Sequence, residues 1–90
     1  MGIVHFKGVY EGVENGMLLF RGEESGIMAI SPIAIQCICL AEVIHGKPVD
    51  PFVQIATGAI IIEVHKWEEE FAEECFDNIL ADWDYVMSTV

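Results

Sequence analysis

Residues 59–85 read AIIIEVHKWEEEFAEECFDNILADWDY, and the repeat of the apolar residues changes inside this stretch. Over residues 59–64 apolar side chains recur at every second position, which is typical of a strand. From Trp67 they recur at every third or fourth position, which predicts an amphipathic helix over residues 67–84. The apolar side of this helix comprises Trp67, Phe71, Ala72, Cys75, Phe76, Ile79, Leu80, Trp83, Val86 and Met87.

Upstream, residues 3–64 are rich in β-forming side chains and are divided by turn signals. Asn15–Gly16 fits a hairpin turn because both residues tolerate a positive φ, and a second hairpin is expected around Thr57–Gly58. Residues His45–Pro51 contain two prolines, which predicts a loop. The strands expected from these signals cover residues 3–10, 17–21, 26–30, 52–56 and 59–64.

The segment from Ile27 to Ile44 is open to more than one interpretation. It is 18 residues long with one charge, a marginal length for a membrane span. Pro32, Gln36 and Glu42 interrupt the run, so we expect buried strands instead of a span. Alternating residues after the proline favour a strand, whereas a proline at a first helical position would suit a short helix.

Ninety residues fit one domain, so residues 1–90 are expected to form a single folded unit. These patterns predict an α+β fold. A small antiparallel sheet of about five strands over residues 3–64 would pack on one C-terminal amphipathic helix over residues 67–84. The apolar fraction of 53% is high for so short a chain and predicts a homo-oligomer that covers surplus apolar surface.

The charge of the chain is concentrated near its C-terminus. Fifteen acidic residues against four basic ones give a net charge of −11, and residues 67–90 hold eight acids and no base. A field of this sign repels nucleic acid and anionic membranes and attracts basic surfaces. We therefore expect no direct contact with nucleic acid or membrane. The alternative is that the acidity serves solubility alone.

Five of the eight acidic residues of the predicted helix lie opposite its apolar side. Glu68 and Glu69 fall in the predicted first turn, where the helix dipole favours negative charge. Like charges three or four residues apart, as in Glu73 and Asp77, cost about 0.2–0.5 kcal/mol per pair in an isolated helix. Keeping this repulsion indicates a basic partner at this face. The predicted partner-binding residues are Glu70, Glu73, Glu74, Asp77 and Asp84, with Trp67 at the rim of the apolar side.

Motifs for catalysis, cofactors or metals are missing from the sequence. There is no glycine-rich phosphate loop, GxSxG or HExxH. The pairs Glu63/His65 and Glu42/His45 come without a nucleophile or a third orienting group. Cys37 and Cys39 would share one strand face, but a zinc site normally needs four ligands. No cofactor, no metal and no enzymatic activity are expected.

The N-terminal residues MGIVHFKGVYEG lack the basic region and apolar run of a signal peptide. The three cysteines, an odd number, are therefore expected to be reduced thiols in a cytoplasmic protein.

Two resemblances accompany these patterns. The run GIMAISPIAIQCI, followed by FVQIATGAIIIEVHKWEEEFAE, resembles FlbD-type flagellar-operon proteins in its strand, proline, TG hairpin and acidic helix start. This likeness covers about residues 26–73 and implies a small β-plus-helix fold. In size and charge the whole chain resembles small acidic phage-encoded inhibitors, including anti-CRISPR proteins and DNA mimics, which implies inhibition by occupying a basic surface.

The function expected from the sequence is that of a non-enzymatic acidic binding protein. It would mask a basic, nucleic-acid-binding surface of a partner protein. The alternative is a homo-oligomeric structural or assembly subunit whose acidic residues only keep it soluble.

Overall fold

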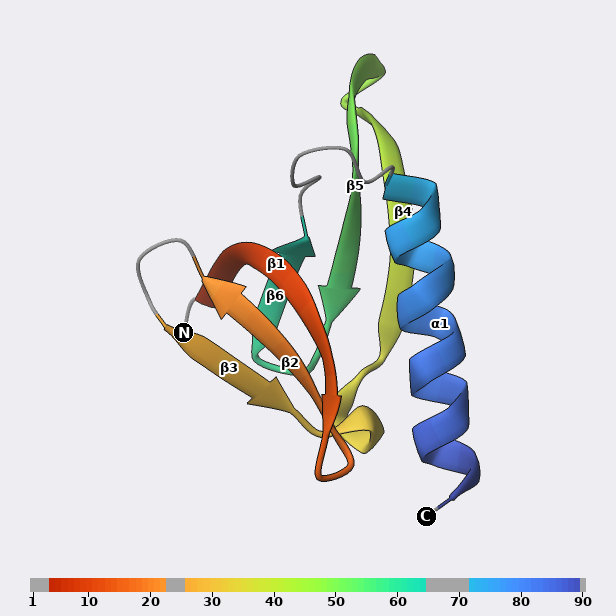
Figure 1. The fold of residues 1–90 in the computed structure, drawn as a ribbon. Helices are drawn as coiled ribbons and strands as arrows, with labels where there is room; N and C mark the ends of the chain where they lie inside the picture. The colour runs from red at the N-terminus through yellow and green to blue at the C-terminus, as the bar shows by residue number, and fades with distance from the viewer. Residues whose placement is uncertain (1–3, 23–25, 65–71, 90) are drawn as a thin grey trace.

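The computed structural model describes residues 4–22, 26–64 and 72–89 of the 90-residue chain (Figure 1). It confirms the α+β class: one sheet of six strands with a C-terminal helix packed against it. The elements follow the order β1 Val4–Glu14, β2 Met17–Gly22, β3 Ile27–Ile30, η1 Pro32–Ala34, β4 Cys37–Ile44, β5 Lys47–Ala56, β6 Ile60–Val64 and α1 Ala72–Ser88.

The sheet consists of two three-stranded antiparallel units joined side by side. Its strand order is β3-β2-β1-β6-β5-β4, and the junction is the parallel pair β1/β6. About five antiparallel strands were expected; the sheet has six, and this one pairing is parallel. Local turn signals specify antiparallel hairpins, whereas the β1/β6 pair joins segments far apart in the sequence.

Gly8 is the point where β1 changes its main pairing partner. Residues 4–8 of β1 pair with β6, and residues 8–14 pair with β2, with a register shift between Tyr10 and Gly12. A Cβ atom on Gly8 would lie 2.0 Å from the carbonyl oxygen of Arg21. A side chain is therefore excluded here, because β1 and β2 approach each other through their backbones.

The predicted turn at Asn15–Gly16 is confirmed, and a turn of the same kind at His45–Gly46 was not predicted. Asn15 and Gly16 have φ angles of 53° and 75° between β1 and β2. His45 and Gly46 repeat this geometry, with φ angles of 52° and 77°, between β4 and β5.

The loop predicted over residues 45–51 is wrong, since β5 begins at Lys47 and contains both prolines of that segment. Pairing with β6 covers only Val53–Ala56 of β5. Pro48 and Pro51 thus lie where the strand has a single neighbour, which is where a sheet accepts proline.

The segment after Pro32 adopts both of the forms that were considered. Pro32–Ala34 form one 3₁₀ turn, and β4 follows from Cys37. Ser31 is extended, with ψ of 132°, as the following proline requires. The run 27–44 is thus β3, η1 and β4. Within the described ranges no helix is long and apolar enough to cross a membrane.

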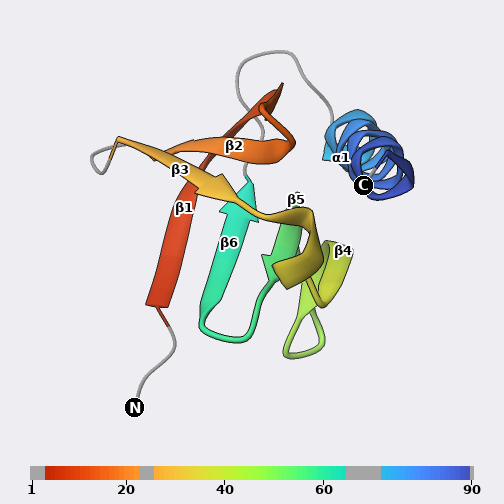
Figure 2. The ribbon, with the colours of Figure 1, turned by 90° about the horizontal axis from the view of Figure 1, so that it is seen from below.

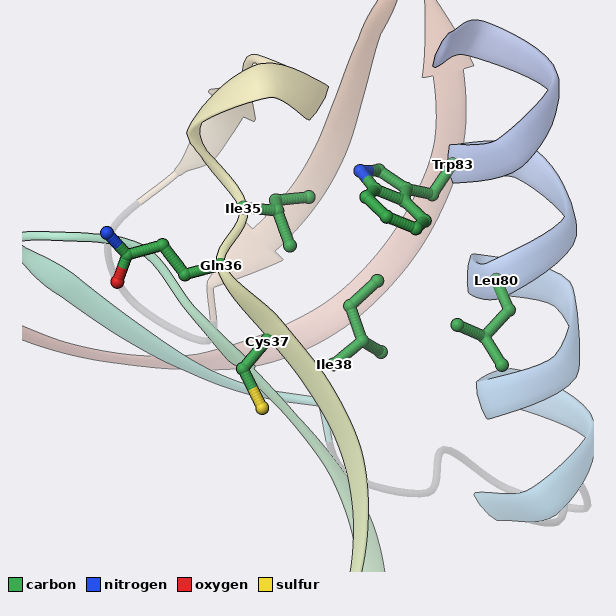
Figure 3. Close-up of a pocket in the computed structure, with 6 residues that line it drawn as sticks. All are labelled: Ile35, Gln36, Cys37, Ile38, Leu80 and Trp83. Carbon is green, nitrogen blue, oxygen red and sulfur yellow. The ribbon is translucent and has the colours of Figure 1, made fainter. Parts of the chain in front are cut away.

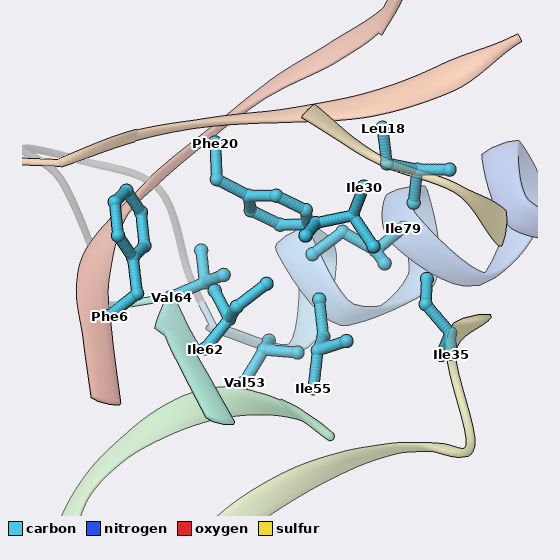
Figure 4. Close-up of a cluster of buried hydrophobic side chains, with 10 residues drawn as sticks. All are labelled: Phe6, Leu18, Phe20, Ile30, Ile35, Val53, Ile55, Ile62, Val64 and Ile79. Carbon is cyan, nitrogen blue, oxygen red and sulfur yellow. The ribbon is translucent and has the colours of Figure 1, made fainter. Parts of the chain in front are cut away.

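The helix α1 lies beside β4 at the open side of the curved sheet, and Figure 2 shows it nearly end-on in this position. Ile79 is fully buried and joins the sheet residues of the core in Figure 4. The helix ends at Ser88, not at residue 84, because Val86 continues its buried side. Met87, at the edge of the predicted apolar side, is 40% exposed. The predicted start at residues 67–71 lies outside the described residues.

Two successive helix residues attach α1 to different parts of the sheet domain. The Tyr10 hydroxyl donates a hydrogen bond of 2.7 Å to Asp82 Oδ2, and the Trp83 indole Nε1 donates one of 2.9 Å to the Pro32 carbonyl oxygen. The Tyr10 ring also packs on Phe20, with ring centroids 5.3 Å apart. These contacts fix the rotation of α1 and so decide which of its residues face solvent.

Candidate protein-binding face

Four of the six predicted partner-binding residues fall in the described part of the chain, and all four are exposed on α1: Glu73, Glu74, Asp77 and Asp84. Their exposed position agrees with the predicted periodicity. Glu70 and Trp67 lie outside the described residues, so the structure neither adds them to this face nor removes them from it.

Three of the exposed acids form a line along the helix. At about 100° per residue, Glu73, Asp77 and Asp84 fall within roughly 40° of one another. We call these three residues the acidic row. The row extends over about 17 Å, since each helical residue rises by about 1.5 Å. Glu74 lies farther around the helix, on the same side as the exposed Tyr85.

No basic residue lies within α1 itself. In the described ranges the one ion pair found joins Arg21 to Glu11, on the neighbouring strands β2 and β1. The acidic row therefore has no ion-pair partner among the described side chains. Its negative charge is available to a partner.

Two of the helical acids also have a structural reason for their position. Glu73 and Glu74 lie in the first turn of α1, where a negative charge gains about 0.3–1 kcal/mol from the helix dipole. The sequence had assigned this role to Glu68 and Glu69, which are outside the described residues. Asp77 and Asp84 lie beyond the first turn, so the dipole does not explain them.

Asp82 has a structural role that the sequence pattern did not reveal. It accepts the Tyr10 hydrogen bond on the packed side of α1, about 160° around the helix from Asp84. Burial and the neighbouring Asp82 carboxylate raise the pKa of Tyr10 above its usual range, so the phenol stays protonated as the donor. An acid on an apolar helix side is the signal that could have identified this contact.

A pocket between α1 and the start of β4 was also missed (Figure 3). Its volume is about 170 Å³, and its lining comprises Ile35, Gln36, Cys37, Ile38, Leu80 and Trp83. Trp83 and Leu80 point from the helix toward Ile35 and Ile38, whereas Gln36 points away from α1. Sequence periodicity cannot reveal such a pocket, because two distant elements form it.

The Cys39 thiol is poorly suited to nucleophilic catalysis. The Cys39 thiol donates a hydrogen bond of 3.9 Å to Gln54 Oε1. Burial raises the pKa of this thiol, and the neighbouring Cys37 adds to the effect. The reactive form of cysteine is the thiolate, so this environment lowers the nucleophilicity of Cys39.

The described ranges also offer little for metal binding or acid–base catalysis. No group of three or more His, Cys, Asp or Glu side chains there could hold a metal ion. His45 occupies the β4–β5 turn with a positive φ. Of the pair Glu63/His65, the histidine lies outside the described residues.

Comparison with known proteins gave no further guide to the activity. No protein-family model matches the chain, and neither the curated proteins nor the solved structures contain a match to it. The function must therefore be inferred from α1 and its surroundings.

Proposed function

We propose that this protein is a non-enzymatic acidic inhibitor that binds a partner protein. The exposed face of α1 would occupy a basic, nucleic-acid-binding surface of that partner and block it. The observation that carries this proposal is the acidic row Glu73, Asp77 and Asp84, exposed on one side of α1 and without an ion-pair partner in the described ranges.

The arrangement of the row favours a binding role over a purely solubilising one. Glu73 and Asp77 are four residues apart, and the cost of such a like-charge pair, about 0.2–0.5 kcal/mol in an isolated helix, is offset at Glu73 by the helix dipole. Solubility requires net charge but no particular line of charges. A single row of unpaired carboxylates therefore supports recognition of a complementary basic groove.

The spacing of the row supports partial imitation of a nucleic acid. Its three carboxylates extend over about 17 Å, whereas one DNA strand places a phosphate about every 3.4 Å. The row thus offers fewer charges than a duplex over the same length. It suits a groove lined by a few lysine and arginine side chains, and the exposed charges would act mainly by accelerating association.

A charge-matched pair of variants tests the proposal. In the helix variant, Glu73, Glu74 and Asp77 are changed to Ala; in the control variant, the exposed Glu14, Glu42 and Asp50 are changed to Ala. Each variant moves the net charge from −11 to −8. Immobilised wild-type protein would first capture partners from the phosphocellulose-binding fraction of source cells.

Surface plasmon resonance then compares the three proteins against each captured partner. We expect the helix variant to associate at least about tenfold more slowly, and the control variant to retain most of the wild-type rate. The wild-type rate should fall steeply as salt rises from ~10 mM to ~1 M, since the Debye length falls from ~30 Å to ~3 Å. If both variants lose association rate equally, binding depends on the net charge of the protein and not on the position of the acidic residues.

The homo-oligomeric subunit is kept as a second candidate because of apolar exposure on the sheet. Val43 and Ile44 are 58% and 41% exposed beside the β4–β5 turn, and Ile27 is 59% exposed on the other edge strand, β3. If the protein is a homo-oligomer, light scattering gives a mass well above the 10.0 kDa of one chain. Changing Val43 to Lys would lower this mass. A wild-type monomer at all concentrations would remove this candidate.

A further inference from the structure

The lining of the pocket between α1 and β4 is mostly apolar, and two of its polar groups, on Trp83 and Gln36, are engaged or turned away. Ile35 is buried, and Ile38, Leu80 and Trp83 are partly exposed where they face one another. The Trp83 indole donates its hydrogen bond to Pro32, and Gln36 points away from the helix. An apolar group therefore fits this pocket better than a polar ligand.

Leu80 connects this pocket to the acidic row. On a helix, residues three and four positions apart are surface neighbours, with Cβ atoms about 5–6 Å apart. Leu80 therefore has Asp77 and Asp84 as neighbours toward solvent, and Phe76 and Trp83 as neighbours toward the sheet. Two exposed carboxylates thus flank the helix side of the pocket mouth.

We propose that the pocket receives one apolar side chain from the basic segment of a partner protein, and that Asp77 and Asp84 bind lysine or arginine side chains on either side of it. This inference rests on the proposed function and adds to it the chemistry of the partner. The partner segment would carry a leucine, isoleucine, methionine or phenylalanine between cationic residues. The pocket supplies affinity, and the carboxylates supply orientation.

The size of the pocket suits a single side chain. Its volume of about 170 Å³ is similar to the roughly 150 Å³ of an engineered apolar cavity that binds benzene in another protein. Full burial of one large aliphatic side chain strengthens binding by roughly 10- to 100-fold. A second copy of this chain is a poorer occupant, because its net charge of −11 would face the acidic row.

Two synthetic peptides test the inference. Each has nine residues, eight of them lysine or arginine, and the central residue is leucine in one and serine in the other. Fluorescence anisotropy would measure their affinity for the wild-type protein and for Leu80→Gln, Asp77→Asn/Asp84→Asn and Ile27→Gln. The last variant removes a more exposed aliphatic side chain on β3, far along the sheet order from β4. Methyl NMR spectra of the wild type would locate the leucine.

We expect the leucine peptide to bind about 10- to 100-fold more tightly than the serine peptide, and to shift the methyl signals of Ile35, Ile38 and Leu80. Leu80→Gln should abolish this preference and leave the serine peptide unchanged, whereas Ile27→Gln should change neither. Asp77→Asn/Asp84→Asn should weaken both peptides.

The contrary results separate the two proposals. Equal affinity of the two peptides, or a preference for leucine without methyl shifts in the pocket, would overturn the pocket inference and leave the acidic face intact. A leucine peptide that does not bind the wild type at millimolar concentration would overturn it as well. Affinities unchanged by Asp77→Asn/Asp84→Asn would instead contradict the role of the acidic row.

Discussion

The β1–β2 and β4–β5 hairpins share a turn geometry but differ in how close their turns lie to the core. In each, a residue with positive φ precedes a glycine, and the first strand has a register shift. Leu18 is fully buried only two residues after Gly16, whereas Phe52 is the first buried residue after Gly46. The β4–β5 hairpin therefore extends beyond the body of the molecule (Figure 1). A turn can thus form with or without a core beside it.

The largest effect is expected where the two halves of the sheet meet. Gly8→Ala should reduce the free energy of unfolding by about 4 kcal/mol or more, because the new Cβ would lie 2.0 Å from the backbone oxygen of Arg21. Relief requires β1 and β2 to separate and to lose hydrogen bonds. Urea denaturation would measure the change. A loss below 1 kcal/mol would mean that β1 and β2 do not approach each other closely at Gly8.

A matched pair of leucines measures the difference between the two halves. Leu18 in β2 is fully buried, whereas Leu40 in β4 is only partly buried against the same core. Leu18→Ala should cost about 3–4 kcal/mol, and Leu40→Ala about 1–2 kcal/mol, because less packing is lost at the more exposed site. Equal costs in thermal denaturation would show that β4 contributes to the core as much as β2 does.

Tyr10→Phe tests the attachment of α1 to β1. Loss of the hydrogen bond to Asp82 should cost about 1–2 kcal/mol at neutral pH.

The same variant should change how stability depends on pH. Since the folded pKa of Tyr10 is raised above its unfolded value near 10, the unfolded state loses this proton first as the pH rises. Stability is therefore lost above about pH 10, at less than the unscreened limit of ~1.4 kcal/mol per pH unit, because solvent reaches this side chain.

Urea denaturation between pH 8 and pH 11 would compare this variant with the wild type. The stability of the wild type should decline more steeply than that of Tyr10→Phe. The raised pKa of the Cys39 thiol also makes stability fall as the pH rises, beginning at a lower pH than for Tyr10. Cys39→Ala removes this contribution and is the control. Parallel pH profiles of wild type and Tyr10→Phe would contradict the assigned role of Tyr10.

The sequence predicted those parts of the fold whose signals are local. The β1–β2 hairpin was identified because Asn15–Gly16 has apolar strands on both sides, and α1 because its apolar residues follow a helical period. The β4–β5 turn was missed because His45–Gly46 is followed by polar residues and two prolines. The parallel β1/β6 pair has no local signal, since its register depends on contacts between distant segments.

The candidate site was predictable to the extent that it is helical. Periodicity alone placed Asp77 and Asp84 on the solvent side of α1, and the structure exposes both. The pocket beside them needs the 3₁₀ turn at Pro32 and the Trp83 hydrogen bond to bring Ile35 and Ile38 opposite Leu80. That arrangement is a product of tertiary packing, which no spacing rule in one segment describes.

The smallest effect is expected from exchanging the two turn residues. Both Asn15 and His45 have a positive φ, and asparagine accepts this conformation more readily before a glycine. His45→Asn should therefore stabilise its turn by about 0.5 kcal/mol or less, and Asn15→His should destabilise the other by a similar amount. The second change should lower the melting temperature by about 2–4 °C, because Leu18 lies in the core two residues from that turn.

The first change should hardly alter the melting temperature, since the end of the β4–β5 hairpin extends beyond the core and can open by itself. Its gain should instead appear as slower amide hydrogen exchange at Ile44 and Lys47, the residue pair that closes the turn. Gly46→Ala is the control and should speed exchange at the same amides, because alanine at a φ of 77° is strained. His45→Asn could instead raise the melting temperature by as much as Asn15→His lowers it. That result would mean that both hairpins unfold together with the core. The two hairpins would then differ only in how exposed their turns are.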